Sequence, residues 1–242
     1  KHIILSLKKF LGHPAANYSD PAKNKHCTEF EVNLYIVSEF ILEKVIPVVG
    51  VHPYPLNELL LMVSSVCWFK PTHIFEWGTH VGKSARIFYE TCRSFSLPVE
   101  IHSTDLLDNV DHCEHPHRNR GIMVQGLPGV YLYQGDGLDT SMKKYREFVQ
   151  RGVVCRPFFY IDGDHEYQSV KRELLGVLQE IPDAAVLLHD TFYQSAGSGY
   201  NIGPYRAIQD VLSLLPDQYK VISTHEGLPG MTFLYRPGGD RV

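Results

Sequence analysis

Apolar residues recur with the spacing of α-helices in the first third of the chain. Over residues 30–45 they return every three or four positions, and Thr28 and Glu31 form a capping box ahead of this pattern. A second apolar helix is expected to begin near Pro55 and to stop before Pro71, because proline suits the first turn of a helix and blocks its continuation. We therefore expect two helices before the rest of the chain.

Beyond the second helix, the pattern changes to short strands that alternate with helical stretches. This alternation is typical of a parallel sheet with helices on both faces. The last two expected strands are joined by residues 225–230 alone, too short a link for a crossover helix, so these two strands should form an antiparallel hairpin. The expected strands are 73–76, 100–104, 130–134, 158–162, 184–189, 219–224 and 231–236.

Length and composition fit one α/β domain with an N-terminal extension. The chain has 242 residues, of which 44% are hydrophobic, and it can bury a full core without disulfides. We place an arm and a helix in residues 1–52 and the α/β domain in residues 53–242. The apolar N-terminal helix could also pack on a second copy of the chain, as a homo-oligomer.

Charge and cysteine usage indicate which partners and which cell compartment to expect. A net charge of -4 argues against nucleic acid as an obligate partner, which usually needs a basic surface. No apolar run approaches the roughly 20 residues that span a bilayer, and the first apolar run is too short for a signal sequence. Five widely spaced cysteines without a C-x-x-C pair fit reduced thiols, so we expect a cytoplasmic protein.

The segment behind the first strand has the features of a nucleotide-binding turn. Residues 76–84 read Glu-Trp-Gly-Thr-His-Val-Gly-Lys-Ser and lead from a strand that ends in an acid into a helix. Gly78 allows a tight turn and a close approach to a ligand, and Gly82 lets the helix pack nearby. The spacing E-x-G-x-x-x-G-x-S differs from the dinucleotide fingerprint. It resembles the first motif of class I S-adenosylmethionine-dependent methyltransferases, in which these residues surround the methionine part of the cofactor.

Polar residues follow each of the five expected parallel strands. Ligands of such sheets bind beyond the carboxyl ends of the strands. The acid after the second strand could accept hydrogen bonds from two ribose hydroxyls, and the polar groups after the third suit an adenine edge. Any one of them could instead be a helix cap or a loop residue. The residues expected to bind the cofactor are Glu76, Gly78, Thr79, Gly82, Ser84, Asp105, Gln134, Gly135, Asp136 and Asp162.

The fourth and fifth strands end in the acids Asp162 and Asp190. Because adjacent strands lie about 4.8 Å apart, both carboxylates can surround one ion. Hard oxygen ligands suit magnesium, calcium or manganese. His189 is either a third ligand or a hydrogen-bond partner of a backbone carbonyl. A structural role, in which both acids cap the following segments, stays open.

Two motifs carry a narrower resemblance. Residues 161–167 read I-D-G-D-H-E-Y and residues 187–191 read L-L-H-D-T. Together they look like the methyltransferase family that includes macrocin-type sugar O-methyltransferases and the cephalosporin hydroxylase group, over about residues 53–236. In metal-dependent relatives both strand-end acids bind a divalent ion, and the base stands three residues after the first, which implies His165 as the general base. His189 departs from the family, since this position is often acidic in metal-dependent members.

The resemblance implies a Rossmann-like fold and an S-adenosylmethionine-dependent O-methyltransferase that acts on a small hydroxylated molecule, a sugar or a phenol, with a divalent metal. Histidine, with a pKa of about 6.5, can take a hydroxyl proton near neutral pH, and the methyl group then needs only an in-line approach. Two other readings are a catalytically silent cofactor-binding scaffold and a metal-dependent oxygenase or hydrolase that uses Asp162, His189 and Asp190.

Two polar loops are candidates for contact with the substrate. Residues 111–118 are rich in histidine, but their spacing matches no zinc motif, so we interpret them as a lid over the cleft. Residues 191–204 lie just beyond the proposed metal site. The identity of the acceptor depends on the shape of such loops and does not follow from the sequence.

Overall fold

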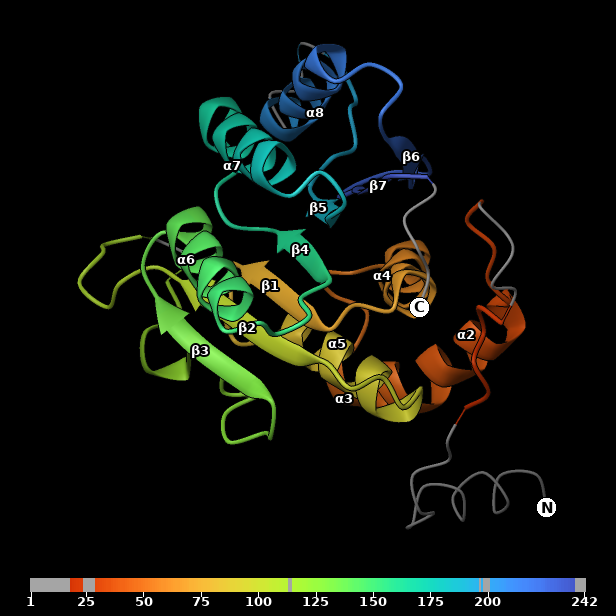
Figure 1. Ribbon diagram of the computed structural model, residues 1–242. Helices are drawn as coiled ribbons and strands as arrows, with labels where there is room; N and C mark the ends of the chain where they lie inside the picture. The colour runs from red at the N-terminus through yellow and green to blue at the C-terminus, as the bar shows by residue number, and fades with distance from the viewer. Residues whose placement is uncertain (1–17, 24–28, 113–114, 196, 198–200, 238–242) are drawn as a thin grey trace, which may run out of the picture.

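The computed structural model describes residues 18–23, 29–112, 115–195, 197 and 201–237, which build a seven-stranded sheet between two layers of helices (Figure 1). The strand order is β3-β2-β1-β4-β5-β7-β6. The first five strands are parallel, and β7 is antiparallel to both β5 and β6. The strands are β1 His73–Trp77, β2 Glu100–Asp105, β3 Val130–Gln134, β4 Pro157–Ile161, β5 Ala185–His189, β6 Lys220–Ser223 and β7 Met231–Tyr235.

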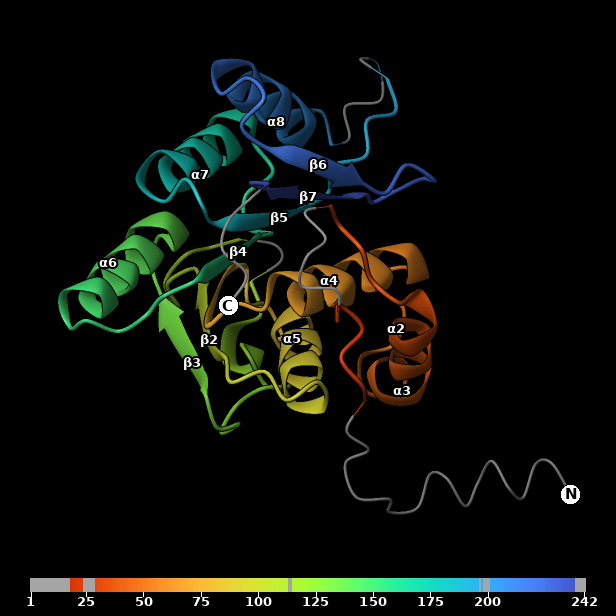
Figure 2. The ribbon, with the colours of Figure 1, turned by 45° about the vertical axis from the view of Figure 1, so that its right-hand side comes forward.

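Helices cover both faces of this sheet (Figure 2). Helices α2 to α5 pack on one face, and α6, α7 and α8 pack on the other. The Rossmann-like α/β fold with a terminal antiparallel hairpin is thereby confirmed. The helices are α2 Leu34–Phe40, a π-helical segment Ile41–Val45, α3 Ile46–Val49, α4 Leu56–Phe69, α5 Lys83–Ser94, a short 3₁₀ turn His117–Asn119, α6 Gly137–Gln150, α7 Tyr167–Glu180 and α8 Ile202–Leu214.

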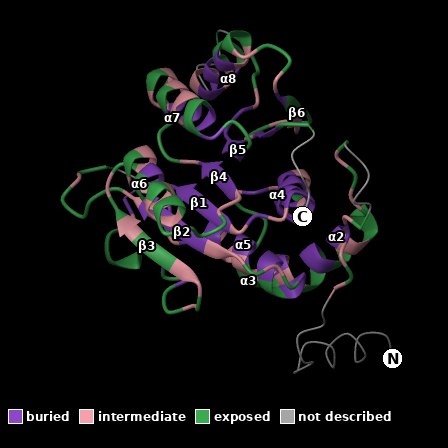
Figure 3. Cartoon of the chain, viewed as in Figure 1, coloured by how far each residue is buried: buried purple, intermediate pink, exposed green. Residues whose placement is uncertain are grey.

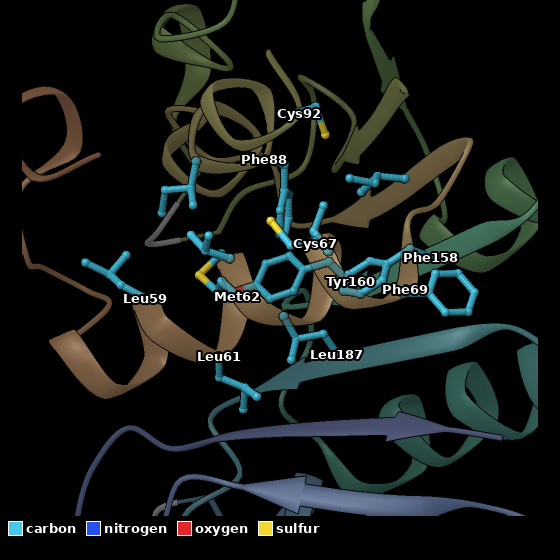
Figure 4. Close-up of a cluster of buried hydrophobic side chains, with 14 of the residues drawn as sticks. Leu59, Leu61, Met62, Cys67, Phe69, Phe88, Cys92, Phe158, Tyr160 and Leu187 are labelled. Carbon is cyan, nitrogen blue, oxygen red and sulfur yellow. The ribbon is translucent and has the colours of Figure 1, made fainter. Parts of the chain in front are cut away.

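The central strands are apolar on both faces because helices cover both. β1, β4, β5 and β7 are buried along their whole length, whereas the edge strand β3 is largely exposed (Figure 3). Along β4, Phe158 and Tyr160 face α4 and α5, and Phe159 and Ile161 face the opposite helices. Figure 4 shows the first of these clusters, in which Phe158 and Tyr160 meet Phe88 of α5. Two-sided burial of this kind fits the near-continuous apolar run of a parallel strand.

The first helix begins later than the capping box predicted. It starts at Leu34, and the side chain of Asn33 accepts a hydrogen bond from the backbone N–H of Tyr35 at 3.1 Å. The backbone N–H of Asn33 in turn donates to the carbonyl of Pro21 at 2.9 Å, which holds the preceding residues out of the helix. The expected start was therefore wrong: Glu31 precedes the helix, and Thr28 lies outside the described residues. Asn33, and not the Thr28–Glu31 capping box, caps this helix.

The N-terminal helices share the core of the α/β domain. Val37, Phe40, Ile41 and Val45 are buried in the same apolar cluster as the residues of α4 and α5. Self-association through this region and a cytoplasmic location stay predictions. Among the described residues, none of the helices combines the length and apolar composition needed to cross a lipid bilayer.

Candidate functional site

The candidate site lies at the carboxyl edge of the sheet, where the strand order reverses between β1 and β4. The chain leaves β1 toward β2 on one side, while β4 lies on the other side, and open parallel sheets bind their ligands at such a switch point. The arrowheads of both strands point to this edge in Figure 1. Trp77 and Ile161 are register partners there, so the glycine turn and the loop after β4 start side by side.

Gly78 is required by the protein backbone itself. Its φ is +90°, and a Cβ at this position would lie 2.0 Å from the carbonyl oxygen of Asp162. The backbone N–H of Asp162 donates to the carbonyl of Trp77 at 3.1 Å, which holds the two segments together. The sequence suggested that Gly78 permits the approach of a ligand, but its closest neighbour is the end of β4. Gly82, with φ +89°, similarly packs on Gly121 and Val124.

Glu76 is a fully buried acid at the end of β1. Its Oε2 accepts a hydrogen bond from the Ser103 hydroxyl, and Ser103 also shares a 2.6 Å hydrogen bond with Thr79. Oε1 has no hydrogen-bond partner among the described residues. Burial raises the pKa of Glu76 to about 7. A buried acceptor without a donor is costly and rare in native proteins, and the ammonium group of S-adenosylmethionine would satisfy it, so these residues fit that cofactor.

Asp105, at the end of β2, holds the turn and retains acceptor capacity. Its Oδ2 accepts from the backbone N–H of His80 and its Oδ1 from that of Leu106, both at 2.8 Å. The guanidinium Nε of Arg120 lies 3.7 Å from Oδ2. Each carboxylate oxygen has a second lone pair, so the predicted pairing with two ribose hydroxyls is compatible with these contacts. Arg120, whose side chain is 9% exposed beside this acid, was not predicted.

Two of the predicted cofactor residues have structural partners. Asp136 caps α6 by accepting from the backbone N–H of Asp139 at 2.9 Å, and it also forms an ion pair with Arg172. The side-chain amide of Gln134 donates to Asp108 at 3.0 Å. For Asp136 the contacts therefore support a helix cap, the alternative that the sequence left open.

The loops after β4 and β5 bring together the predicted acids and histidines. Asp162 Oδ1 lies 3.1 Å from His189 Nδ1 and 3.7 Å from His165 Nε2. Asp190 Oδ2 lies 3.1 Å from His165 Nε2 and 3.4 Å from His189 Nδ1. The His165 side chain is 45% exposed, whereas those of His189 and Asp190 are buried. His165 is therefore the member of the cluster that an acceptor can reach.

Three buried residues that the sequence did not indicate complete the cluster. Glu58, which is fully buried in the first turn of α4, places Oε2 3.0 Å from His189 Nε2, and its Oε1 accepts from the backbone N–H of Gly230 at 2.7 Å. The hydroxyls of Tyr54 and Tyr160 donate to Asp162 Oδ2 at 3.0 and 2.9 Å. One signal was available, because Glu58 is the one acid in the apolar stretch that forms α4.

The charges in the cluster stabilise one another. Burial alone would raise the pKa of Asp162, but the His189 charge and hydrogen bonds with both histidines hold it well below its usual range. Burial alone would lower the pKa of His189, but the charge of Asp162 and hydrogen bonds with Asp162, Asp190 and Glu58 raise it well above its usual value. The hydrogen bond with Asp162 also raises the pKa of His165.

The predicted metal ligands lie close together but do not fit a divalent cation as they stand. Asp162, His189 and Asp190 each offer a ligand atom within 4.8 Å of the others. Both ring nitrogens of His189, however, already face carboxylates, and a metal ligand needs a free nitrogen lone pair. The same contacts leave His189 unsuited to the oxygenase reading, which needs two histidine ligands.

The histidine-rich loop does not form a zinc site with its described residues. His115 Nε2 lies 3.1 Å from the carbonyl of Leu107 and 3.0 Å from the Arg120 guanidinium. The two groups of potential metal ligands among the described residues lie elsewhere, at His73, Glu100 and His102 and at Asp162, His189 and Asp190. Cys113 and Glu114 lie outside the described residues.

Comparisons with known proteins agree with this fold. Residues 75–191 match the model of a family described as a methyltransferase domain. No curated protein matches the sequence. The O-methyltransferase TomG from Streptomyces achromogenes, solved in complex with SAM, is 12% identical with a TM-score of 0.55, over 84% of this chain and 96% of TomG. An O-methyltransferase from Bacillus cereus, solved in complex with SAH, is 14% identical with a TM-score of 0.51, over 83% of this chain and 90% of the other.

At these identities the solved structures show only that the fold is the same. The family model shows a similarity in sequence over the matched segment alone. That segment runs from β1 through the glycine turn to the loop after β5, and so includes the strand-end residues described above. Residues 75–191 are thus similar to a methyltransferase domain, and the chain has the fold of the two O-methyltransferases.

Proposed function

We propose that this protein transfers a methyl group from S-adenosylmethionine to a hydroxyl of a small molecule, a sugar or a phenol, with His165 as the general base. The observation that carries the proposal is a half-exposed histidine paired with a buried acid beside the methyltransferase turn. The narrower kinship with macrocin-type enzymes and the choice of acceptor belong to this proposal and rest on the sequence motifs.

His165 is held in a form suited to accept a proton. With Nε2–H donating to Asp190 at 3.1 Å, the other ring nitrogen, Nδ1, carries the lone pair. Nδ1 takes the proton of the acceptor hydroxyl as its oxygen attacks the methyl carbon. Bound S-adenosylmethionine supplies an electrophilic methyl group whose C–S bond breaks with the electron pair going to sulfur. Asp190 and Asp162 then stabilise the imidazolium that has formed.

The pKa of His165 sets the expected pH dependence. Since the neutral ring is the base, and the hydrogen bond with Asp162 raises its pKa, the rate should rise with pH through a midpoint above the usual value for histidine. The metal-assisted version of the reaction would need a cation beside Asp162 and Asp190, and the contacts of His189 do not favour it.

The test is the turnover of His165→Ala against a panel of sugars and phenols, read as formation of S-adenosylhomocysteine. The variant should bind S-adenosylhomocysteine as the wild type does and lose about 10²–10⁴-fold in rate. His225→Ala, which removes an exposed histidine outside the cluster, is the matched control. Wild-type turnover by His165→Ala would exclude His165 as the base. A wild-type protein that binds the cofactor but methylates nothing in the panel would support the silent-scaffold reading instead.

A further inference from the structure

We infer that His189 is a built-in cation: its doubly protonated ring occupies the place between the strand-end acids, and the site works without a divalent metal ion. The inference deepens the proposed function, because it concerns the same acids. Its tests use no acceptor and no turnover, so it can fail while methyl transfer stands, and the reverse.

The two carboxylate contacts of His189 require a proton on each ring nitrogen. His189 Nε2 faces Glu58 Oε2 at 3.0 Å, and Nδ1 faces Asp162 Oδ1 at 3.1 Å. A neutral imidazole carries one N–H, so one of its nitrogens would direct a lone pair at a carboxylate oxygen. A ring that donates from both nitrogens satisfies both contacts, and that ring carries a positive charge.

The three acids around His189 are buried, so their negative charges need a positive charge nearby. Glu58 is fully buried, and the side chains of Asp162 and Asp190 are 14% and 8% exposed. Carboxylates so buried need a cation or several hydrogen-bond donors nearby. His189 contacts all three, and His165 contacts the two aspartates from the solvent side. Among the described residues, His189 is thus the cationic group that reaches Glu58.

Carboxylate oxygen atoms that a metal ion would bind already have hydrogen-bond donors within the protein. Asp162 Oδ2 accepts from the hydroxyls of Tyr54 and Tyr160, and Oδ1 faces His189. Glu58 Oε1 accepts from the backbone N–H of Gly230. These donors come from the segment before α4, from β4 and from the loop before β7, so the cluster is held rigid from several sides. A divalent ion would have to displace the imidazolium and break this arrangement.

The inference assigns His189 a positioning role. It fixes Asp162 and Asp190, and Asp190 in turn orients the His165 ring by the 3.1 Å contact at Nε2. His189 itself lies behind these acids, with its side chain 5% exposed, and does not reach an acceptor.

The direct test replaces the cationic His189 by a carboxylate that can bind a metal ion. Mn²⁺ binding, followed by electron paramagnetic resonance, should be absent or weak in the wild type and at least about tenfold tighter in His189→Asp, which removes the buried counter-ion of Glu58, Asp162 and Asp190 and adds a fourth carboxylate. The double variant H189D/D190N is the matched control and should lose the gain. Stoichiometric Mn²⁺ binding by the wild type, or no gain in a folded His189→Asp, would overturn the inference.

A measurement on the wild type keeps the inference testable if His189→Asp does not fold. Nitrogen-15 spectra of the histidine rings, assigned with His189→Gln, should show both nitrogens of His189 protonated at a pH where free histidine is neutral. A neutral His189 ring at that pH would contradict the inference.

Discussion

The two halves of the site differ in how their buried polar atoms are satisfied. At the ends of β1 and β2, the buried Glu76 keeps an oxygen without a hydrogen-bond donor among the described residues. At the ends of β4 and β5, both carboxylate oxygens of Asp162 and both ring nitrogens of His189 are engaged by neighbours. The end of β1 thus keeps a buried acceptor without a donor among the described residues, whereas the groups at the ends of β4 and β5 satisfy one another. The comparison teaches that strand-end acids in one sheet can serve opposite purposes.

The largest effect is expected where the two halves touch. Gly78→Ala should cost more than about 4 kcal/mol of unfolding free energy, because its Cβ would meet the Asp162 carbonyl at 2.0 Å. Gly50→Ala is the control, since Gly50 has a similar φ of +76° but no atom within 4 Å of the added carbon. It should cost only the strain of a side chain in a backbone conformation that favours glycine, about 1–3 kcal/mol. Equal losses in denaturant unfolding would mean that contact with β4 does not hold the turn.

Removal of a charge from the cluster at the ends of β4 and β5 should also lower the free energy of unfolding. Glu58→Gln leaves the buried His189 with an amide in place of one carboxylate, and breaking a buried ion pair costs about 3–5 kcal/mol. Glu173→Gln is the matched control. Glu173 is a buried acid whose Oε2 has no partner among the described residues, and burial raises its pKa to about 8. A neutral amide should suit that position, so a similar loss in both variants would contradict the account of His189.

Much of the fold, including the turn after β1, could be predicted from the sequence because the relevant contacts are local or periodic. Glu76 and the glycine turn are adjacent in the chain, and the short link 225–230 forces the hairpin. The partners of the second half could not be predicted. Glu58 reaches His189 across 131 positions and Gly230 across 172, and such pairs form only when the helix docks on the sheet. The predicted start of the first helix was wrong for a related reason. Asparagine and threonine are both good caps, and the sequence alone does not choose between Asn33 and Thr28.

Substitution of the acid at the end of β1 should lower the affinity for the cofactor. Glu76→Gln should weaken binding of S-adenosylhomocysteine by about 10- to 100-fold, because a hydrogen bond to a charged group contributes about 1.5–3 kcal/mol. Asp136→Asn is the control, since asparagine caps a helix as well as aspartate does and the Asp136 side chain already serves as a cap. Calorimetry measures both variants. An effect of Asp136→Asn as large as that of Glu76→Gln would return Asp136 to the cofactor site.

The smallest effect is a pH dependence of the same affinity. Burial raises the pKa of Glu76 to about 7 in the free protein, so at lower pH its carboxyl group is protonated and cannot pair with the ligand's ammonium group. Affinity should therefore rise with pH toward about 7 by at most about tenfold per unit and level off above it. The dependence should vanish in Glu76→Gln. A wild-type affinity that is constant over this range would show that the cofactor does not contact Glu76.

The contrast between the two halves is tested most directly by one calorimetric titration of the wild type with S-adenosylhomocysteine, repeated in excess EDTA and in excess magnesium. The account predicts one binding site per chain with the same affinity in both buffers, since the cofactor fills an open acceptor at Glu76 and His189 already supplies the charge beside Asp162 and Asp190. Binding that is absent, or that requires magnesium, would contradict it.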